Sequence, residues 1–98
     1  FVAPADPKLL GEIKGLKVNL AKSATKDALH AAVKSLTLVG SDSDPWSPDG
    51  VQETFGEPLG VEAIIIQGAK HFKADEGWGP WQGLVDWVND PSADITIR

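Results

Sequence analysis

Apolar and β-branched residues gather in three short segments of the chain, which are typical of buried β-strands. Residues 36–40 form one such run, which is closed by a glycine. Residues 61–66 form the strongest run, because three consecutive isoleucines make it β-branched and apolar on both faces. Burial on both faces predicts that residues 61–66 are a central strand of a parallel sheet. Residues 1–5 are predicted to be a third short buried strand, ended by Pro4 and Pro7.

Apolar residues at helical spacing alternate with these runs and predict three helices. The first covers residues 24–34, with Ser23 as its N-cap, and the second is a short helix within residues 51–59. The third has Pro80 in its first turn, where proline is favoured, and ends near residue 89. A weaker pattern at residues 9–16 is interrupted by glycines. An amphipathic helix turns its apolar positions toward the core, and here those positions include Leu29, Val33, Phe55, Leu59, Trp81, Leu84, Val85 and Val88.

The predicted order is strand, helix, strand, helix, strand, helix, which is the signature of parallel βαβ units and of the α/β fold class. We expect three layers, with a short parallel sheet flanked by helices. A three-stranded parallel sheet has two exposed edges, so we also expect partner strands outside the chain. The 98 residues contain no methionine, even at the start, which favours a piece of a longer protein.

Composition excludes several classes of function. The net charge is −5 and the nine Lys and Arg residues are dispersed, which argues against a nucleic-acid partner because phosphate binding needs clustered basic side chains. The absence of cysteine removes thiol catalysis and thiolate metal sites. No apolar run approaches the ~20 residues that span a bilayer, and no secretory signal is present, so we expect no membrane partner and a cytoplasmic location.

Two chemically active side chains follow neighbouring strands of the predicted sheet. Asp44 comes after the run 36–40, and His71 comes after the run 61–66. The carboxyl ends of parallel strands share one rim, where α/β proteins place their ligands. An aspartate bound to one imidazole nitrogen orients the ring while the other nitrogen takes a proton from a nucleophile. The alternative is structural, because Asp-Pro pairs commonly start turns and a histidine near a strand end is often only polar.

Three segments of the chain resemble the carboxy-terminal half of the small α/β-hydrolases related to retinoblastoma-binding protein 9 and the bacterial YdeN proteins. They are Gly-Ser-Asp-Ser-Asp-Pro-Trp at residues 40–46, Gly-Ala-Lys-His-Phe at residues 68–72 and Gly-Trp-Gly-Pro-Trp at residues 77–81. The resemblance covers nearly the whole chain. It implies a partial α/β-hydrolase fold, with Asp44 rather than Asp42 as the triad acid and His71 as the triad base.

The nucleophile of such a triad has no counterpart in the chain. In α/β-hydrolases the serine precedes the acid and the base and lies in a Gly-x-Ser-x-Gly elbow. None of the serines has that setting; they are Ser23, Ser35, Ser41, Ser43, Ser47 and Ser92. The resemblance therefore implies that residues 1–98 are the carboxy-terminal portion of one hydrolase domain. The serine and its oxyanion hole would lie in an amino-terminal half or on a second chain.

The remaining candidate residues concern substrate and metal. Trp46 and Trp78 lie in the acid and base segments and are expected either to line a pocket for a small acyl-ester substrate or to pack in the core. We expect no metal site, because the aspartates of residues 42–49 do not follow the EF-hand pattern. No cofactor is needed for hydrolysis. His30 is expected to pack or to lie on the surface, and the acidic pair at residues 75–76 is expected to be solvated.

A second function class remains open. A hydrolase-derived layer without a nucleophile is able to serve as a non-catalytic α/β binding module. Its recognition surface would then use the two tryptophans of the acid and base segments, because exposed aromatic side chains mark recognition surfaces.

Overall fold

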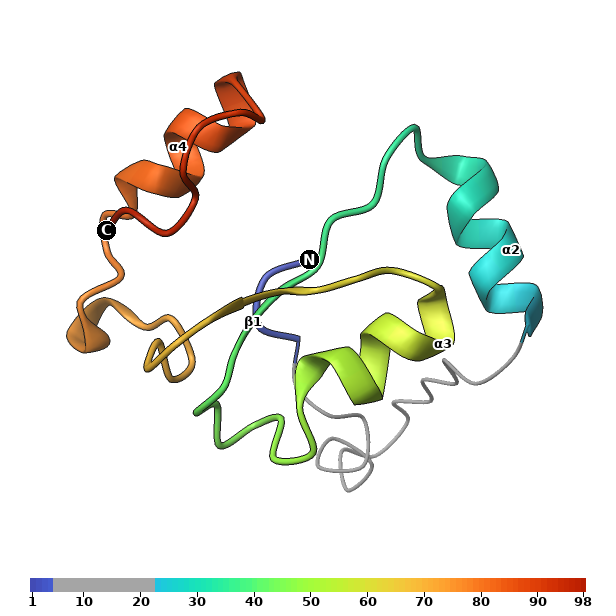
Figure 1. Ribbon diagram of the computed structural model, residues 1–98, viewed down its shortest axis with the longest axis horizontal. Coiled ribbons are helices and arrows are strands. Elements are labelled where there is room, and N and C mark those ends of the chain that lie inside the picture. The colour runs from blue at the N-terminus through green and yellow to red at the C-terminus, as the bar shows by residue number, and fades with distance from the viewer. Residues whose placement is uncertain (5–22) are drawn as a thin grey trace.

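The computed structural model describes residues 1–4 and 23–98, and the weak helical pattern at residues 9–16 lies outside them. The described residues form a small α/β structure with a two-stranded parallel sheet and three α-helices (Figure 1). The α/β class expected from the alternating pattern is confirmed at this level. The elements are α2 (Ser23–Ala32), β1 (Val39–Ser41), the π-helical turn η1 (Gln52–Gly56), α3 (Glu57–Leu59), β2 (Ile64–Ile66), the 3₁₀ turn η2 (Ala74–Glu76) and α4 (Gln82–Asn89).

The sheet places β1, not β2, between two neighbours. β2 runs parallel to one side of β1, with Ser41 opposite Ile66. On the other side Val2 forms a parallel bridge to Val39. Within the described residues β2 is therefore an edge strand, and Ile65 is 43% exposed. The prediction of a central strand at residues 61–66 is wrong, because a β-branched run has the same composition at an edge that helices cover as at the centre of a sheet.

The amino-terminal segment also differs from the prediction. Two backbone hydrogen bonds hold it to β1: the Ala3 N–H donates to the Val39 carbonyl and the Val39 N–H donates to the Phe1 carbonyl, both at 2.8 Å. Only Ala3 is buried, whereas Phe1 and Val2 are exposed. The segment is thus a single bridge with an apolar outer side and not a buried strand.

The core lies on both sides of β1, because successive residues of a strand point to opposite faces. Val39 packs with the side chains around α4, while its neighbour Leu38 packs with η1 and α3. The first cluster contains Val39, Ile66, Ala69, Trp78, Trp81 and Ile95, and the second contains Leu38, Val51, Phe55 and Leu59. This helix–sheet–helix arrangement is compatible with part of a hydrolase-like layer.

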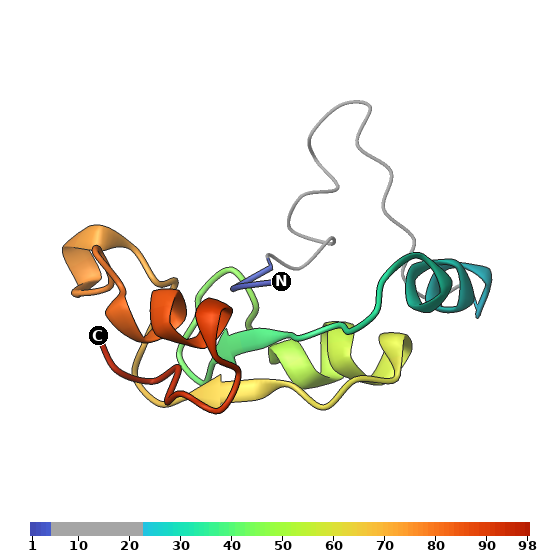
Figure 2. The same ribbon diagram turned by 90° about the horizontal axis from the view of Figure 1, so that it is seen from above.

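Helix α2 lies beside α3 and away from α4 (Figure 2). The helix spans Ser23–Ala32 and ends two residues before the predicted Lys34. His30 Nε2 contacts the Leu59 carbonyl oxygen at 2.5 Å and so links α2 to α3. The expectation that His30 has a packing or surface role agrees with this contact.

The apolar face predicted for helix α4 is buried only in part. Trp81 is 8% exposed and Leu84 packs against the core, as predicted. The helix begins at Gln82, after Pro80, and its Val85 and Val88 are 52% and 68% exposed instead of facing the core. The carboxy-terminal segment contacts the start of this helix. Its carbonyls accept the indole N–H of Trp81 and the backbone N–H of Gly83 at 2.8 and 2.7 Å, so the face that follows Trp81 turns inward. None of the described helices combines the length and the apolarity that crossing a bilayer requires.

Candidate active site

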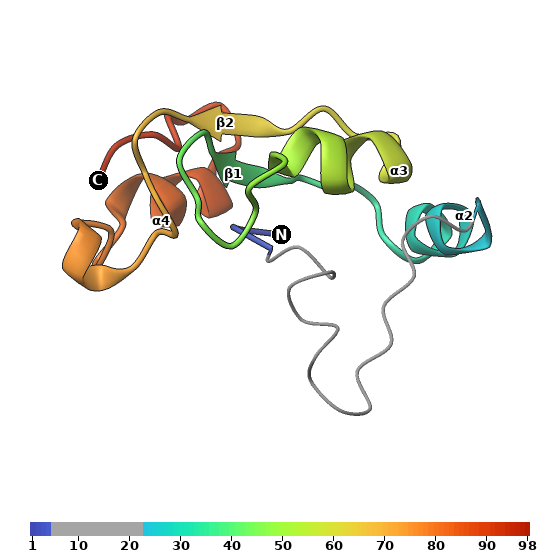
Figure 3. The ribbon, with the colours of Figure 1, turned by 90° about the horizontal axis from the view of Figure 1, so that it is seen from below.

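The structure brings Asp44 and His71 together at one end of the sheet. Parallel pairing aligns the last residues of β1 and β2, Ser41 and Ile66, so both following loops leave at the same rim (Figure 3). Asp44 lies three residues beyond β1 and His71 five residues beyond β2. Asp44 Oδ2 and His71 Nδ1 are 2.8 Å apart, which is the length of a charge-assisted hydrogen bond.

The orientation of the Asp44 carboxylate is fixed by its own loop. Its second oxygen, Oδ1, accepts the backbone N–H of Trp46 at 2.9 Å, and its carbonyl accepts the N–H of Ser47 at 3.2 Å. The side chain of Asp44 is fully buried. With one oxygen held by the backbone, the other is directed at the imidazole and has no access to water.

The imidazole of His71 has one nitrogen bound and one available. A carboxylate only accepts hydrogen bonds, so Nδ1 is the donor toward Asp44 and the lone pair lies on Nε2. Among the residues that the structure describes, Nε2 has no hydrogen-bond partner, and the side chain is 28% exposed. This imidazole is therefore oriented to accept a proton from a group that approaches from outside the described surface.

The acid loop also supports the backbone on which His71 lies. Asp42 Oδ1 accepts the N–H of Gly68 at 2.7 Å, and Ser43 Oγ accepts the N–H of Lys70 at 3.2 Å. Asp42, the alternative acid in the sequence, therefore binds backbone and not the imidazole. Sequence reasoning did not identify this role of Asp42 and Ser43, since the partners are main-chain N–H groups that every residue type offers.

Glu76 supports the same turn from the other side. Its Oε2 accepts the N–H groups of His71 and Lys73 at 3.0 and 3.1 Å, and its side chain is 14% exposed. The prediction of a solvated acidic pair is therefore wrong for Glu76, although it is right for Asp75, which is 78% exposed. Partial burial raises the pKa of the Glu76 carboxyl, but the two N–H donors and nearby lysine charges outweigh that effect and hold the pKa below its ordinary value.

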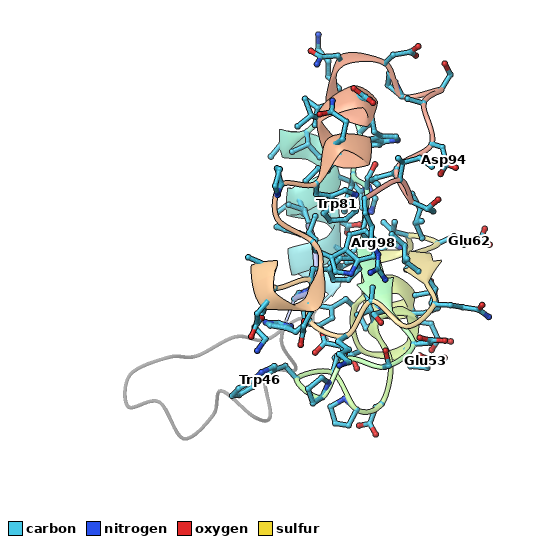
Figure 4. All side chains as sticks on the ribbon, turned by 90° about the vertical axis from the view of Figure 1, so that its left-hand side faces the viewer. Trp46, Glu53, Glu62, Trp81, Asp94 and Arg98 are labelled. Carbon is cyan, nitrogen blue, oxygen red and sulfur yellow. The ribbon has the colours of Figure 1, made fainter. Side chains whose placement is uncertain are left out.

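The two tryptophans assigned to the site lie in different surroundings. Trp46 is 48% exposed, and its ring centroid lies 6.2 Å from that of His71. It extends from the acid loop to the molecular surface (Figure 4). Trp78 is 4% exposed and packs 5.0 Å from Phe72 and 4.8 Å from Trp81 between ring centroids. This placement agrees with the packing alternative for Trp78, whereas Trp46 offers a surface to a ligand next to the imidazole.

No serine of the described chain is hydrogen-bonded to His71. Ser41 and Ser43 contact each other at 3.1 Å between hydroxyl oxygens, and the Ser92 hydroxyl donates to Asp90. Residues 1–4 and 23–98 also contain no cluster of three or more His, Cys, Asp or Glu side chains that is arranged to hold a metal ion. The arrangement therefore consists of an oriented imidazole, a buried carboxylate and an adjacent aromatic surface.

Comparison with known proteins gives one match. Residues 1–89 match the model of the protein family described as serine hydrolase. No curated protein and no solved structure matches the chain.

Proposed function

The chain belongs to the serine hydrolase family, and we propose that Asp44 and His71 are the acid and the base of a Ser-Asp-His triad that hydrolyses small acyl esters. The observation that carries this proposal is the 2.8 Å bond between a fully buried carboxylate and an imidazole whose Nε2 is unbound among the described residues. A buried carboxylate bound to one ring nitrogen is the arrangement that orients an imidazole to accept a proton through the other nitrogen.

The proposed reaction has two steps, acylation of the serine and hydrolysis of the acyl-enzyme, and His71 Nε2 takes up and returns a proton in each step. His71 Nε2 takes the proton of the serine hydroxyl as Oγ attacks the carbonyl carbon of the ester, and the imidazolium that forms is stabilised by Asp44. The tetrahedral intermediate collapses, and Nε2 returns the proton to the departing alkoxide. Water then repeats the sequence on the acyl-enzyme. Trp46 lies beside the imidazole and is proposed to form one wall of the substrate pocket.

We further propose that residues 1–98 are the carboxy-terminal portion of the hydrolase domain and that the serine lies on another segment. The absence of a Gly-x-Ser-x-Gly elbow from the sequence supports this arrangement. The His71 Nε2 supports it as well, since this nitrogen has no partner among the described residues and would bind a serine hydroxyl from another segment. An amino-terminal half of the same polypeptide and a separate second chain are the two possible sources.

The test is a His71→Ala substitution in the full-length protein, assayed with a p-nitrophenyl ester. We expect turnover to be abolished while a cooperative unfolding transition remains at a lower temperature, because the substitution removes the proton acceptor and also leaves the buried Asp44 Oδ2 without its partner. His30→Ala is the matched control, since His30 lies on α2 and contacts the Leu59 carbonyl. Wild-type turnover in the His71→Ala variant would refute the proposed base.

The exposed Trp46 favours a second candidate, a non-catalytic binding module that uses this aromatic surface. The two candidates differ in their reaction with fluorophosphonate probes, which label an activated serine. A hydrolase is labelled in the full-length protein and a binding module is not. Loss of labelling in the His71→Ala variant would assign the activation to this histidine.

A further inference from the structure

The backbone that carries His71 is strained on both sides of that residue. Lys70 and Phe72 have φ angles of 52° and 58°, in the left-handed region that residues with a Cβ rarely occupy. Such conformations persist only where the surrounding structure holds them, and they concentrate at functional sites. The turn that presents the imidazole therefore depends on contacts from outside its three residues.

Glu76 makes the contact that acts on His71 itself. A single carboxylate oxygen, Oε2, accepts the N–H groups of both His71 and Lys73. The bond to Lys73 is explained by helix capping, since Glu76 is the third residue of η2 and reaches back to the residue before it. Capping does not explain the bond to His71, which lies two residues before the cap.

We infer that Glu76 is a positioning residue for His71, an inference that rests on the proposed role of His71 as the base. The bond to the His71 N–H fixes the backbone from which the imidazole reaches Asp44. It thereby keeps Nδ1 within 2.8 Å of Asp44 Oδ2, which leaves Nε2 as the ring nitrogen available to a reacting group. The preceding residue of the turn, Lys70, is held through its own N–H by Ser43 Oγ, so the strained turn is supported on both sides.

The geometry of the two bonds sets the expected behaviour of variants. Both donors bind one oxygen, and the amide oxygen of a Glu76→Gln variant has two lone pairs at the same reach, so it replaces that oxygen. A Glu76→Asp variant keeps the charge but is one methylene shorter, which withdraws the oxygen from the N–H groups. Asp75→Ala is the matched control, because Asp75 lies on the same turn and its only described contact is with the Lys73 ammonium, at 3.8 Å.

The experiment follows the His71 Nδ1–H proton resonance by NMR in the full-length protein, with the resonance assigned through its loss in a His71→Gln variant. We expect the resonance to disappear or broaden in Glu76→Ala and Glu76→Asp, and to persist in Glu76→Gln and Asp75→Ala. In parallel we expect kcat for a p-nitrophenyl ester to fall by about 10²-fold in Glu76→Asp with little change in KM, because a misplaced base weakens the chemical step more than binding. Glu76→Gln should keep most of the wild-type kcat that Glu76→Asp loses.

An undisturbed Nδ1–H resonance in Glu76→Asp would overturn the inference whatever the activity. If Glu76→Ala fails to fold, the comparison of Glu76→Asp with Glu76→Gln still decides, since both keep a side chain in place. Retention of esterase activity by His71→Ala would instead refute the proposed function. The resonance would even then report whether Glu76 holds the imidazole against Asp44.

Discussion

An Asp44→Asn substitution tests the proposed triad at its buried member. The asparagine oxygen is able to keep the N–H bond of Trp46, which leaves the new NH₂ group facing His71 Nδ1 across the present 2.8 Å. An amide NH₂ donates, so Nδ1 becomes the acceptor and the ring proton moves to Nε2. The imidazole is then held in the tautomer that is unable to take a proton from serine.

The size of the effect follows from two losses. Restoring the active tautomer sets two donors against each other in a site where Asp44 is fully buried, and an unsatisfied buried donor costs about 1–3 kcal/mol. The imidazolium also loses a carboxylate charge at roughly 4 Å, which is worth about 4 kcal/mol at an effective dielectric constant of about 20. Together they give about 6 kcal/mol, so we expect kcat/KM to fall by about 10⁴-fold.

The assay is hydrolysis of a p-nitrophenyl ester by the full-length protein, with thermal unfolding measured alongside. Asp42→Asn is the matched control, because Asp42 lies two residues away in the same loop and binds the Gly68 N–H through an oxygen that asparagine keeps. We expect this control to retain activity within about threefold, since a neutral acceptor weakens a hydrogen bond only modestly. A loss below about tenfold in Asp44→Asn, or an equal loss in Asp42→Asn, would refute the reasoning.

Three further predictions concern stability. Gly83→Ala should destabilise the fold by about 1–3 kcal/mol, because a Cβ there collides with backbone carbonyl oxygens of the carboxy-terminal segment, including that of Ile97. Thermal unfolding checks this, with Val85→Ala as the control at an exposed position. Lys70→Gly should leave the free energy of unfolding in denaturant unchanged or raise it by up to about 1 kcal/mol, because glycine relieves the strain of the positive φ angle at some entropic cost. A loss above about 1 kcal/mol would contradict the claim that Lys70 is strained. The Glu76 carboxyl has a folded pKa below its ordinary value of 4.5, so its stabilising contribution is complete above that value and is lost as the pH falls through the folded pKa. Glu76→Gln should therefore flatten the acid side of a curve of unfolding free energy against pH. An unchanged acid side would contradict the assignment.

The proximity of Asp44 and His71 was accessible from the sequence because each follows a strand of a parallel pair. Parallel strands bring their carboxyl ends to one rim. The contact between two residues 27 positions apart is therefore predictable without a description of the intervening helix. The supports of the base were not accessible in this way. Asp42, Ser43 and Glu76 bind backbone N–H groups. Every residue type except proline has such a donor, so the sequence does not identify these partners.

The misassigned faces have a related cause. Hydrophobic periodicity shows that one face of α4 is apolar, but it does not show which partner will cover that face. The carboxy-terminal segment binds Trp81 and Gly83 and so selects the buried side, leaving Val85 and Val88 exposed. The edge position of β2 was missed for the same reason, because the order of strands depends on pairing and not on composition.

If the serine of the proposed triad lies on another segment, the bridge at Val2 offers one edge at which the strand that carries it would pair. Parallel strands lie about 4.8 Å apart, and residues 1–3 pair with β1 on the side away from β2. No described residue pairs with the outer edge of this segment, and Phe1 and Val2 are exposed there. A further parallel strand on that edge would end at the rim where Asp44 and His71 already lie, because parallel strands share the direction of their carboxyl ends. Under the proposed triad, a serine on the loop after such a strand would approach His71 Nε2 from this side of the sheet, while the other unpaired edge among the described residues belongs to β2.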